Sequence, residues 1–487
     1  MTMTEPARLF VLTACFLATS FEGAHAAPLR SEPVFAAPVL AAPVFDATVF
    51  EATVFEAPML DAAVFAAPVL DAAVLAAPVL ARPAPAPQGE EAFKASDYEN
   101  VGKKLTGYIE ARRESSGIDK ALEEVSKELE KVAKRLKRDP LSLPAEMGRV
   151  LWASFEYGKK GSVSKGKVDT LTDAAYWDPK AKFTYAVWVP AKYDTKKAYP
   201  LILCIPELGQ KPSEHLTVDW IDPAIRENAI LLAVPTPTEA GALLEGINPS
   251  KETGMGNVGR LWSSATRKYA VDFDRVYLAG RGRGVELAVA YGANFPDRFA
   301  GVIGRAGDVG TIVPENLKNL PTFFAGAGAK AGELADTLKT LGYDNATLLP
   351  EGKESDVWSW MQAHARVSNP TDVVLYVGSP APNRAYWLEV RPSDAQGSPY
   401  LKAKVDRATN TITVEGEGVP KFVVYFNDVL LDLDKPVKVI ANGTANERTV
   451  PRSLQRTLDL VLNSRSDPGK FYVASMEFDL PPKPKPK

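Results

Sequence analysis

Apolar side chains recur along this chain with several different spacings, and each spacing predicts a different kind of structure. Over residues 118–136 the apolar positions lie four and three residues apart, and glutamate and lysine fill most other positions. This is the stripe of an amphipathic helix, and Asp139-Pro140 ends it. We therefore expect residues 90–157 to form a helical segment, either a hairpin packed on the following domain or a short coiled-coil contact with another chain.

The middle of the chain, residues 180–368, alternates short apolar runs with helical stretches, which is typical of an α/β sheet. Its predicted strands are Thr184–Val189, Leu201–Ile205, Ile230–Val234, Arg275–Ala279, Gly301–Arg305 and Thr322–Ala325. Residues 370–480 change to short alternating strands and predict a β-rich domain. These strands are Ala385–Val390, Leu401–Val405, Thr411–Glu415, Phe422–Phe426, Val437–Ile440 and Phe471–Phe478, and one helix, Ser453–Asn463, interrupts them. The proline- and lysine-rich tail at 481–487 is expected to be disordered.

Residues 33–80 repeat a unit of five residues, such as AAPVF, EATVF and DAAVF. Five is the period of neither a helix nor a strand, and the recurrent prolines oppose both structures. The segment 28–89 is thus expected to be an extended linker. The alternative is an apolar, adhesive tract that docks on a partner protein or surface. It is considered because a purely polar linker would not need two large apolar residues in every five.

The N-terminus resembles a secretory signal over residues 1–27, with Arg8, a short apolar run and a cleavage site of the Ala-x-Ala type at Ala24-His25-Ala26. We expect export to a periplasmic or extracellular location. The less favoured alternative is a lipoprotein, because Leu12-Thr13-Ala14-Cys15 matches a lipobox. The apolar run is too short to span a bilayer, so no transmembrane span is expected. Removal of the signal leaves one cysteine, Cys204, in an apolar strand, where it is expected to be a buried structural thiol.

The composition indicates a soluble globular protein of several structural units. The chain has 487 residues, with 57 lysines and arginines against 60 aspartates and glutamates, a formal net charge of −3. That balance gives no indication of nucleic-acid binding. No zinc, Walker or dinucleotide motif stands out, so no cofactor is expected.

One motif in the middle of the chain carries the strongest family signal. Gly280-Arg281-Gly282-Arg283-Gly284 follows an apolar strand, and the surrounding segment reads YAVDFDRVYLAGRGRGVELAVAYGANFPDRFAGVIGRAG over 269–307. With FTYAVWVPAKYDTKKAYPLILCIP at 183–206, this resembles secreted α/β-hydrolases of the polyhydroxybutyrate-depolymerase and prolyl-oligopeptidase type. The C-terminal part, notably DLDKPVKVIANG at 432–443, resembles a β domain appended to such proteins. The resemblance implies a doubly wound α/β-hydrolase sheet over 180–368, between the helical segment and the β-rich domain.

The same resemblance implies that the catalytic residues of those enzymes are absent here. Gly282 stands at the nucleophile position of G-x-S-x-G and has no hydroxyl. Pro206 and Glu207 stand in the oxyanion loop, where a carboxylate is electrostatically unfavourable for a developing oxyanion. Ala329 stands where the acid is expected, and the base region around Glu354 has no histidine. The only histidines are His25, His215 and His364, and we expect the last two to be structural or surface residues.

Three hypotheses for function follow from these substitutions. The favoured one is an exported, non-enzymatic α/β-hydrolase-fold protein that acts as a binding or structural module. The second is an active esterase or peptidase that uses other residues, drawn from Ser263, Ser264, Ser355, Asp308, Glu354 and Asp356. The third is an anion site at the turn Gly280–Gly284, which corresponds to the nucleophile turn of such enzymes. There Arg281 and Arg283 add charge to the positive end of a helix. Those arginines could instead pair with Glu286 or Asp308.

Overall fold

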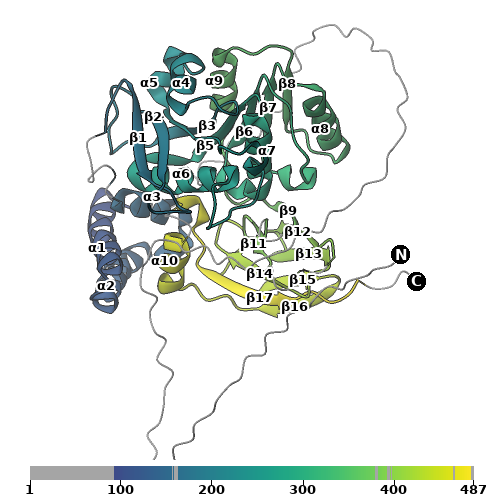
Figure 1. The fold of residues 1–487 in the computed structure, drawn as a ribbon. Helices are drawn as coiled ribbons and strands as arrows, with labels where there is room; N and C mark the ends of the chain where they lie inside the picture. The colour runs from purple at the N-terminus through teal and green to yellow at the C-terminus, as the bar shows by residue number, and fades with distance from the viewer. Residues whose placement is uncertain are drawn as a thin grey trace, which may run out of the picture. The chain divides into compact units, whose positions relative to one another are not determined.

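The structure of the protein is a computed structural model that describes residues 93–155, 157, 163–378, 382–391, 395, 397–463 and 467–483 (Figure 1). All of these belong to one compact unit. The signal-like residues 1–27, the lipobox at Cys15 and the linker with its five-residue repeats lie outside the described residues. In the described part, no helix is both long and apolar enough to cross a membrane.

The centre of the described chain is an eight-stranded sheet in the order β1-β2-β4-β3-β5-β6-β7-β8. Strands β3 to β8 run parallel, and β2 is antiparallel to β1 and β4. The strands are β1 Val168–Ala174, β2 Lys182–Trp188, β3 Tyr199–Ile205, β4 Ile230–Ala233, β5 Val271–Arg281, β6 Gly301–Arg305, β7 Thr322–Ala325 and β8 Ala346–Leu349. All six strands predicted for this region are therefore confirmed. The two additional strands, β1 and β8, form the edges of the sheet.

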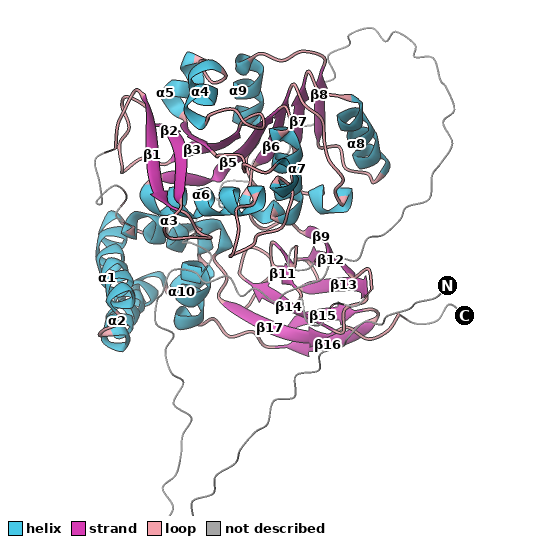
Figure 2. Ribbon diagram, viewed as in Figure 1, coloured by secondary structure: helices cyan, strands magenta, loops and turns pink. Residues whose placement is uncertain are grey.

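Helices cover both faces of this sheet, because neighbouring residues of a strand point to opposite sides. Leu201 and Leu203 of β3 belong to one apolar cluster, and Ile202 and Cys204 belong to another. The first cluster contains residues of α6 Gly254–Lys268, α7 Gly284–Asn294 and α8 Ala329–Thr340. The second contains residues of α4 Pro212–Val218, α5 Pro223–Asn228 and α9 Glu354–Ala363. Figure 2 shows the helices on either side of the sheet. The doubly wound α/β prediction is confirmed, and Cys204 is a fully buried free thiol.

The remaining strands form two smaller sheets in the C-terminal part of the chain. One has the order β10-β11-β14-β17 and the other β16-β15-β13-β12-β9. Their bounds are β9 Asp372–Tyr376, β10 Arg384–Ala385, β11 Leu388–Glu389, β12 Tyr400–Asp406, β13 Thr411–Glu417, β14 Lys421–Phe426, β15 Val437–Ala441, β16 Thr444–Arg448 and β17 Ala474–Asp479. The predicted helix is α10 Leu454–Asn463. The predicted strand Ala385–Val390 is in fact split in two by a turn, because Tyr386 has a φ of +56°.

The N-terminal helices share their apolar core with these C-terminal sheets. The helices are α1 Ala95–Glu114, α2 Ile118–Leu136 and α3 Pro144–Ser154. One buried cluster contains Val101, Val125 and Val150 together with residues of β9 to β15 and of β17. The expectation that the helical segment packs on the following domain is met only in part, through Trp152, whose indole N–H donates to the Val271 carbonyl at 2.9 Å. Its main apolar partner is the far end of the chain.

The beginning of the proline- and lysine-rich tail is also held in place, contrary to the expectation for residues 481–487. The side-chain amide of Asn442 donates to the Pro481 carbonyl at 2.7 Å. The ammonium of Lys483 donates to the Tyr400 hydroxyl at 2.7 Å. Residues 484–487 lie outside the described residues.

Candidate functional site

The sequence motif at 280–284 forms a tight turn between β5 and α7. Gly282 has a φ of +53°, a left-handed conformation that favours glycine. A Cβ on Gly280 would lie 2.3 Å from the Gly284 carbonyl oxygen, and a Cβ on Gly284 would lie 2.4 Å from the Ile205 carbonyl oxygen. Both positions therefore need glycine for the close approach of β3, β5 and α7. This is the geometry expected of a nucleophile elbow.

The space beside Gly282 is filled by the side chain of Glu207, from the loop that follows β3. A Cβ built on Gly282 would lie only 1.2 Å from Oε2 of Glu207. The backbone N–H of Arg283 donates to both carboxylate oxygens, at 3.2 Å each. The backbone N–H of Leu208 donates to Oε1 at 2.9 Å. The carboxylate thus accepts from two amides, one in the turn after β5 and one in the loop after β3.

These two amides are of the kind that forms an oxyanion hole in the α/β-hydrolase fold. Such a hole combines the N–H of the residue after the nucleophile with an N–H from the loop after the third strand. Arg283 and Leu208 hold those places here, and Glu207 supplies the anion itself. From the sequence, the Glu207 carboxylate was expected to be electrostatically unfavourable for a developing oxyanion in this loop. In the structure the carboxylate lies where such an oxyanion would lie and accepts hydrogen bonds from the same donors.

The two arginines of the turn are paired with carboxylates of the same chain. Nε of Arg283 donates to Oε1 of Glu286 at 3.1 Å, one of the two pairings that the sequence suggested. NH1 of Arg281 lies 3.0 Å from Oδ1 of Asp219, on the segment after α4, rather than beside Asp308. Both arginine side chains are 40–45% exposed, so each pair is a modest surface interaction.

Asp219 is the centre of a polar cluster at the carboxyl ends of the parallel strands. Its Oδ2 accepts from the side-chain amide of Gln210 at 3.0 Å, and its carbonyl accepts from Arg305 at 2.7 Å. NH2 of Arg305 also lies 4.0 Å from Oε1 of Glu354. The Glu354 carboxylate accepts the backbone N–H of Asp222 at 2.8 Å. Glu354 lies in the region where the family resemblance places the catalytic base, and here it joins α9 to the segment before α5.

His215 belongs to this cluster, and both of its ring nitrogens are engaged. Nδ1 lies 2.9 Å from Oδ2 of Asp219, and Nε2 accepts the indole N–H of Trp220 at 3.1 Å. These partners assign the neutral tautomer with its proton on Nδ1. Burial lowers the pKa of His215 to about 4, against the opposing effect of Asp219. The nitrogen that a general base would use is therefore already occupied by a donor.

His364 lies near the amino ends of the central strands, where the Tyr277 hydroxyl of β5 donates to its carbonyl at 2.6 Å. It follows α9 directly, at the C-cap position of that helix. Nδ1 is 2.7 Å from the Trp360 carbonyl, and the ring stacks on Trp360 with centroids 4.3 Å apart. Trp360 in turn packs against Gly301, the first residue of β6. The elbow lies at the opposite ends of these strands, so the structure does not bring His364 and Gly282 together.

At the position expected for the catalytic acid, the structure has the beginning of a helix. Ala329 is the first residue of α8, and a carboxylate from the preceding strand connection binds that helix end. Oδ1 of Asp308 accepts the N–H of Ala331 at 2.9 Å, and Oδ2 accepts that of Lys330 at 3.3 Å. A Cβ on Gly328 would lie 2.5 Å from Oδ2 of Asp308. Asp308 thus stabilises the positive end of α8.

The other groups proposed for an alternative mechanism are dispersed. Ser263 and Ser264 lie on α6, where Ser263 is buried and Ser264 hydrogen-bonds to the Tyr185 hydroxyl. Ser355 is exposed in the first turn of α9. Asp356 accepts the backbone N–H of Lys353 at 2.8 Å and so caps the same helix. Within the described residues, no group of three or more histidine, cysteine, aspartate or glutamate side chains could hold a metal ion.

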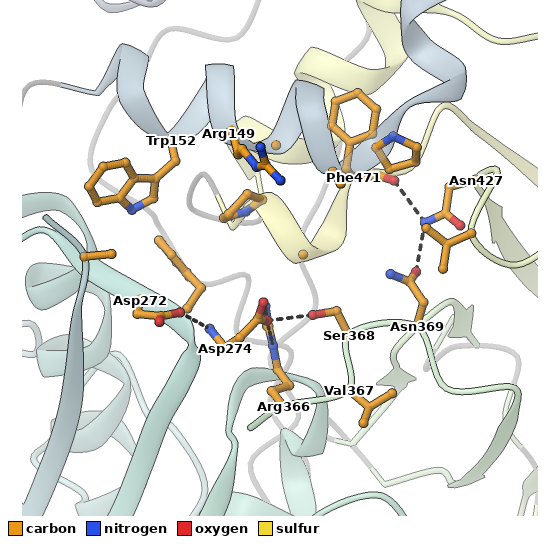
Figure 3. Close-up of a pocket in the computed structure, with 18 of the residues that line it drawn as sticks. Arg149, Trp152, Asp272, Asp274, Arg366, Val367, Ser368, Asn369, Asn427 and Phe471 are labelled. Carbon is orange, nitrogen blue, oxygen red and sulfur yellow. Dashed lines mark hydrogen bonds and ion pairs between the residues drawn. The ribbon is translucent and has the colours of Figure 1, made fainter. Parts of the chain in front are cut away.

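A cavity of about 590 Å³ lies at the amino-terminal side of β5, away from the elbow. Figure 3 shows Trp152 and Arg149 on one wall and Asp272, Asp274 and Arg366 on another. Most of the lining is apolar, and several of its polar groups bond to one another: for example, the Ser368 hydroxyl donates to Asp274 at 2.8 Å. The elbow motif and this cavity are therefore separate features.

Comparisons with known proteins give matches in structure only. No protein-family model and no curated protein matches the sequence. A thermostable esterase matches with 18% identity over 41% of this chain and 64% of that chain, with a TM-score of 0.34. A ferulic acid esterase from Anaeromyces mucronatus matches with 12% identity over 42% of this chain and 93% of that chain, with a TM-score of 0.32. An S-formylglutathione hydrolase from Agrobacterium tumefaciens matches with 13% identity, 42% and 96% coverage and a TM-score of 0.31.

The fold class rests on the chain's own topology. The strand order, the single antiparallel strand β2 within an otherwise unidirectional sheet, the helices on both faces and the turn at Gly282 all agree. The described part of this chain is therefore built around a sheet of the α/β-hydrolase fold.

Proposed function

We propose that this protein is an exported α/β-hydrolase-fold protein without serine-hydrolase activity, which acts as a binding or structural module. Export is inferred from the signal-like residues 1–27. The observation that carries the loss of activity is the position of the Glu207 carboxylate beside Gly282. The module would contact a partner protein or a surface through the repeats at 33–80.

Acyl transfer by a serine hydrolase needs a nucleophile, a base within hydrogen-bond reach of it, and free donors for the oxyanion. Gly282 provides no nucleophile. His215 follows the loop after β3, and both of its ring nitrogens are engaged in hydrogen bonds, one with Asp219 and one with Trp220. The two amides that would stabilise an oxyanion already bind Glu207. A substrate carbonyl would have to displace a charged acceptor from its donors before any chemistry began.

In this account the turn has a structural role. The Glu207 carboxylate ties the loop after β3 to the first turn of α7, across 76 residues of sequence. Hydrogen bonds to an ionised acceptor are stronger than neutral ones, at about 1.5–3 kcal/mol each. The positive end of α7 also favours the negative charge. The anion-binding capacity of the elbow is therefore used within the molecule.

The alternative is an active esterase or peptidase-type hydrolase that uses non-standard residues. Its support is the fold class, and one of its candidate nucleophiles, Ser263, has a buried hydroxyl for which the described residues offer no hydrogen-bond partner. A direct assay of esterase activity distinguishes the inactive module from the active hydrolase. Purified protein is treated with a fluorophosphonate probe, and hydrolysis of p-nitrophenyl acetate and butyrate is followed in parallel.

We expect no covalent adduct by mass spectrometry and no hydrolysis above that of the heat-unfolded protein. A stoichiometric adduct on one serine, with activity lost when that serine is changed to alanine, would establish the alternative. Ser263→Ala and Ser355→Ala are the first variants to compare. Ser359→Ala, an exposed position on α9, is the matched control.

A further inference from the structure

A second cavity, of about 370 Å³, lies where the central sheet's connections meet the C-terminal sheets and α10. Its lining contains four cationic side chains, those of Arg298, Arg384, Arg456 and Lys470. The elements that supply them are far apart in the sequence: the turn after α7, strand β10, helix α10 and the turn before β17. The folded chain therefore gathers positive charge around one partly open cavity.

The carboxylates of the lining are already paired. Asp297 accepts from the Lys470 ammonium at 2.6 Å, and both side chains are at least 90% buried. Asp467 accepts two hydrogen bonds from Arg366, which lies outside the lining, at 2.5 and 2.7 Å. Glu389 accepts the Tyr425 hydroxyl at 2.7 Å.

The pairing leaves arginines without a carboxylate at hydrogen-bond distance. Arg384 lies 3.9 Å from Glu389 and stacks on the Tyr425 ring at 4.1 Å. Arg298 stacks on Phe295 at 4.1 Å and donates to a tyrosine hydroxyl. Arg456 donates to the Ser475 hydroxyl at 2.8 Å. Among the described residues, neither Arg298 nor Arg456 has an ion-pair partner.

A guanidinium carries five N–H donors, so each of these arginines keeps donors that its present contacts do not use. Stacking on a ring fixes the plane of the guanidinium and directs its remaining donors sideways. Positive charge that is partly removed from water with no carboxylate at hydrogen-bond distance is unfavourable, and this is the position of Arg384, whose side chain is 24% exposed. Burial also lowers the pKa of the Lys470 ammonium to about 8, despite its pairing with Asp297. A bound anion would neutralise part of the positive charge that these side chains bring to the cavity.

We propose that this cavity binds a small anion that carries a carboxylate or phosphate group, held chiefly by Arg298, Arg384 and Arg456. Planar guanidinium groups suit the two or three oxygens of such an anion. The apolar rings of the lining would accommodate a short organic portion. The site is independent of the elbow, where Glu207 already serves as the anion.

The test is calorimetric titration of the full-length protein with inorganic phosphate and, separately, with benzoate at constant ionic strength. Binding of either probe with one site per chain is expected. Binding of phosphate alone assigns the site to phosphate groups, and tighter binding of benzoate assigns it to aromatic carboxylates. Arg456→Gln and Arg298→Gln should each weaken the binding at least about tenfold, as expected from losing one charge-assisted contact.

Two control variants keep the test specific. Arg448→Gln changes an arginine on β16 that is not part of the lining, and Arg283→Gln changes the elbow. Both should bind as the unchanged protein does. The proposal is overturned if neither probe binds, if binding is unaltered in both Arg298→Gln and Arg456→Gln, or if Arg283→Gln abolishes it. Arg456 is exposed, so Arg456→Gln is expected to fold. If Arg298→Gln fails to fold, the binding measured with Arg456→Gln decides whether the proposal holds.

Discussion

The carboxylate of Glu207 occupies the place where a side chain on Gly282 would begin. Its Oε2 lies 1.2 Å from the Cβ that any other residue at 282 would carry, and both oxygens accept the N–H of the next residue. The two positions are therefore sterically coupled. Glycine at 282 is what allows glutamate at 207 to bind the turn.

Gly282→Ala is predicted to be strongly destabilising. An alanine at a φ of +53° costs about 1–2 kcal/mol, and the Cβ also displaces the Glu207 carboxylate from its donors. We expect a total loss of about 3–5 kcal/mol in the free energy of unfolding, measured by urea denaturation. Gly332→Ala on α8 is the matched control, because no atom lies within 4 Å of its added Cβ. That control should be neutral or stabilise the protein by about 0.5–1 kcal/mol.

Glu207→Gln tests the charge of this contact at nearly constant shape. The amide oxygen can still accept from Arg283 or Leu208, but the interaction with the positive end of α7 and the charged hydrogen bonds are lost. We predict a loss of about 1–2 kcal/mol in the free energy of unfolding at pH 7. Equal stability of the two proteins would contradict an ionised Glu207 at the turn.

Acidification should destabilise the protein through His215. Its pKa in the fold is about 4, below the ordinary value near 6.5, so the unfolded chain binds a proton in this range and the fold does not. The contribution is complete above pH 6.5 and is lost as the pH falls towards 4, with an upper bound of about 3 kcal/mol. In His215→Gln the slope of unfolding free energy against pH between 4 and 6.5 should be smaller. An unchanged slope would show that other groups carry this dependence.

The buried guanidinium of Arg366 should contribute far more to stability than a surface arginine. Its side chain is 1% exposed and binds both Asp467 and Asp274, which joins the segment after α9 to β5 and to the turn before β17. Arg366→Ala leaves the buried Asp467 carboxylate without its partner, and a loss of about 3–5 kcal/mol is expected. Arg275→Ala, which breaks a pair with a 44% exposed arginine, should cost at most about 1 kcal/mol. Similar losses for the two variants in urea denaturation would contradict this account.

The sequence was most informative about strands that are mostly apolar and almost wholly buried. Strands β3, β6 and β7 are of this kind and were predicted within two residues of their ends. The edge strand β1 was not predicted, because its side chains are only half-buried and largely polar, and so its pattern is weak. The joint core of the N-terminal helices with the C-terminal sheets was also missed, since apolar periodicity shows that a face is buried but not against what.

The candidate site was predictable in its residues but not in its contacts. The motif fixed the turn and identified Gly282, Glu207 and Ala329 as departures from a hydrolase pattern. The contact between Glu207 and Arg283 joins positions 76 residues apart, and it depends on a carboxylate reaching two backbone amides. Backbone donors carry no signal in the sequence. For the same reason, Asp219 was not recognised as the partner shared by Arg281 and His215.

The central claim is that Glu207 and Gly282 form one structural unit, and a double-mutant cycle of Gly282→Ala and Glu207→Ala tests it most directly. Urea denaturation gives the free energy of unfolding of the four proteins. We predict that Gly282→Ala costs about 1.5–3 kcal/mol less when residue 207 is alanine, because the displaced carboxylate is then already absent. If the two substitutions are additive within about 0.5 kcal/mol, the carboxylate does not occupy the turn and the account is contradicted.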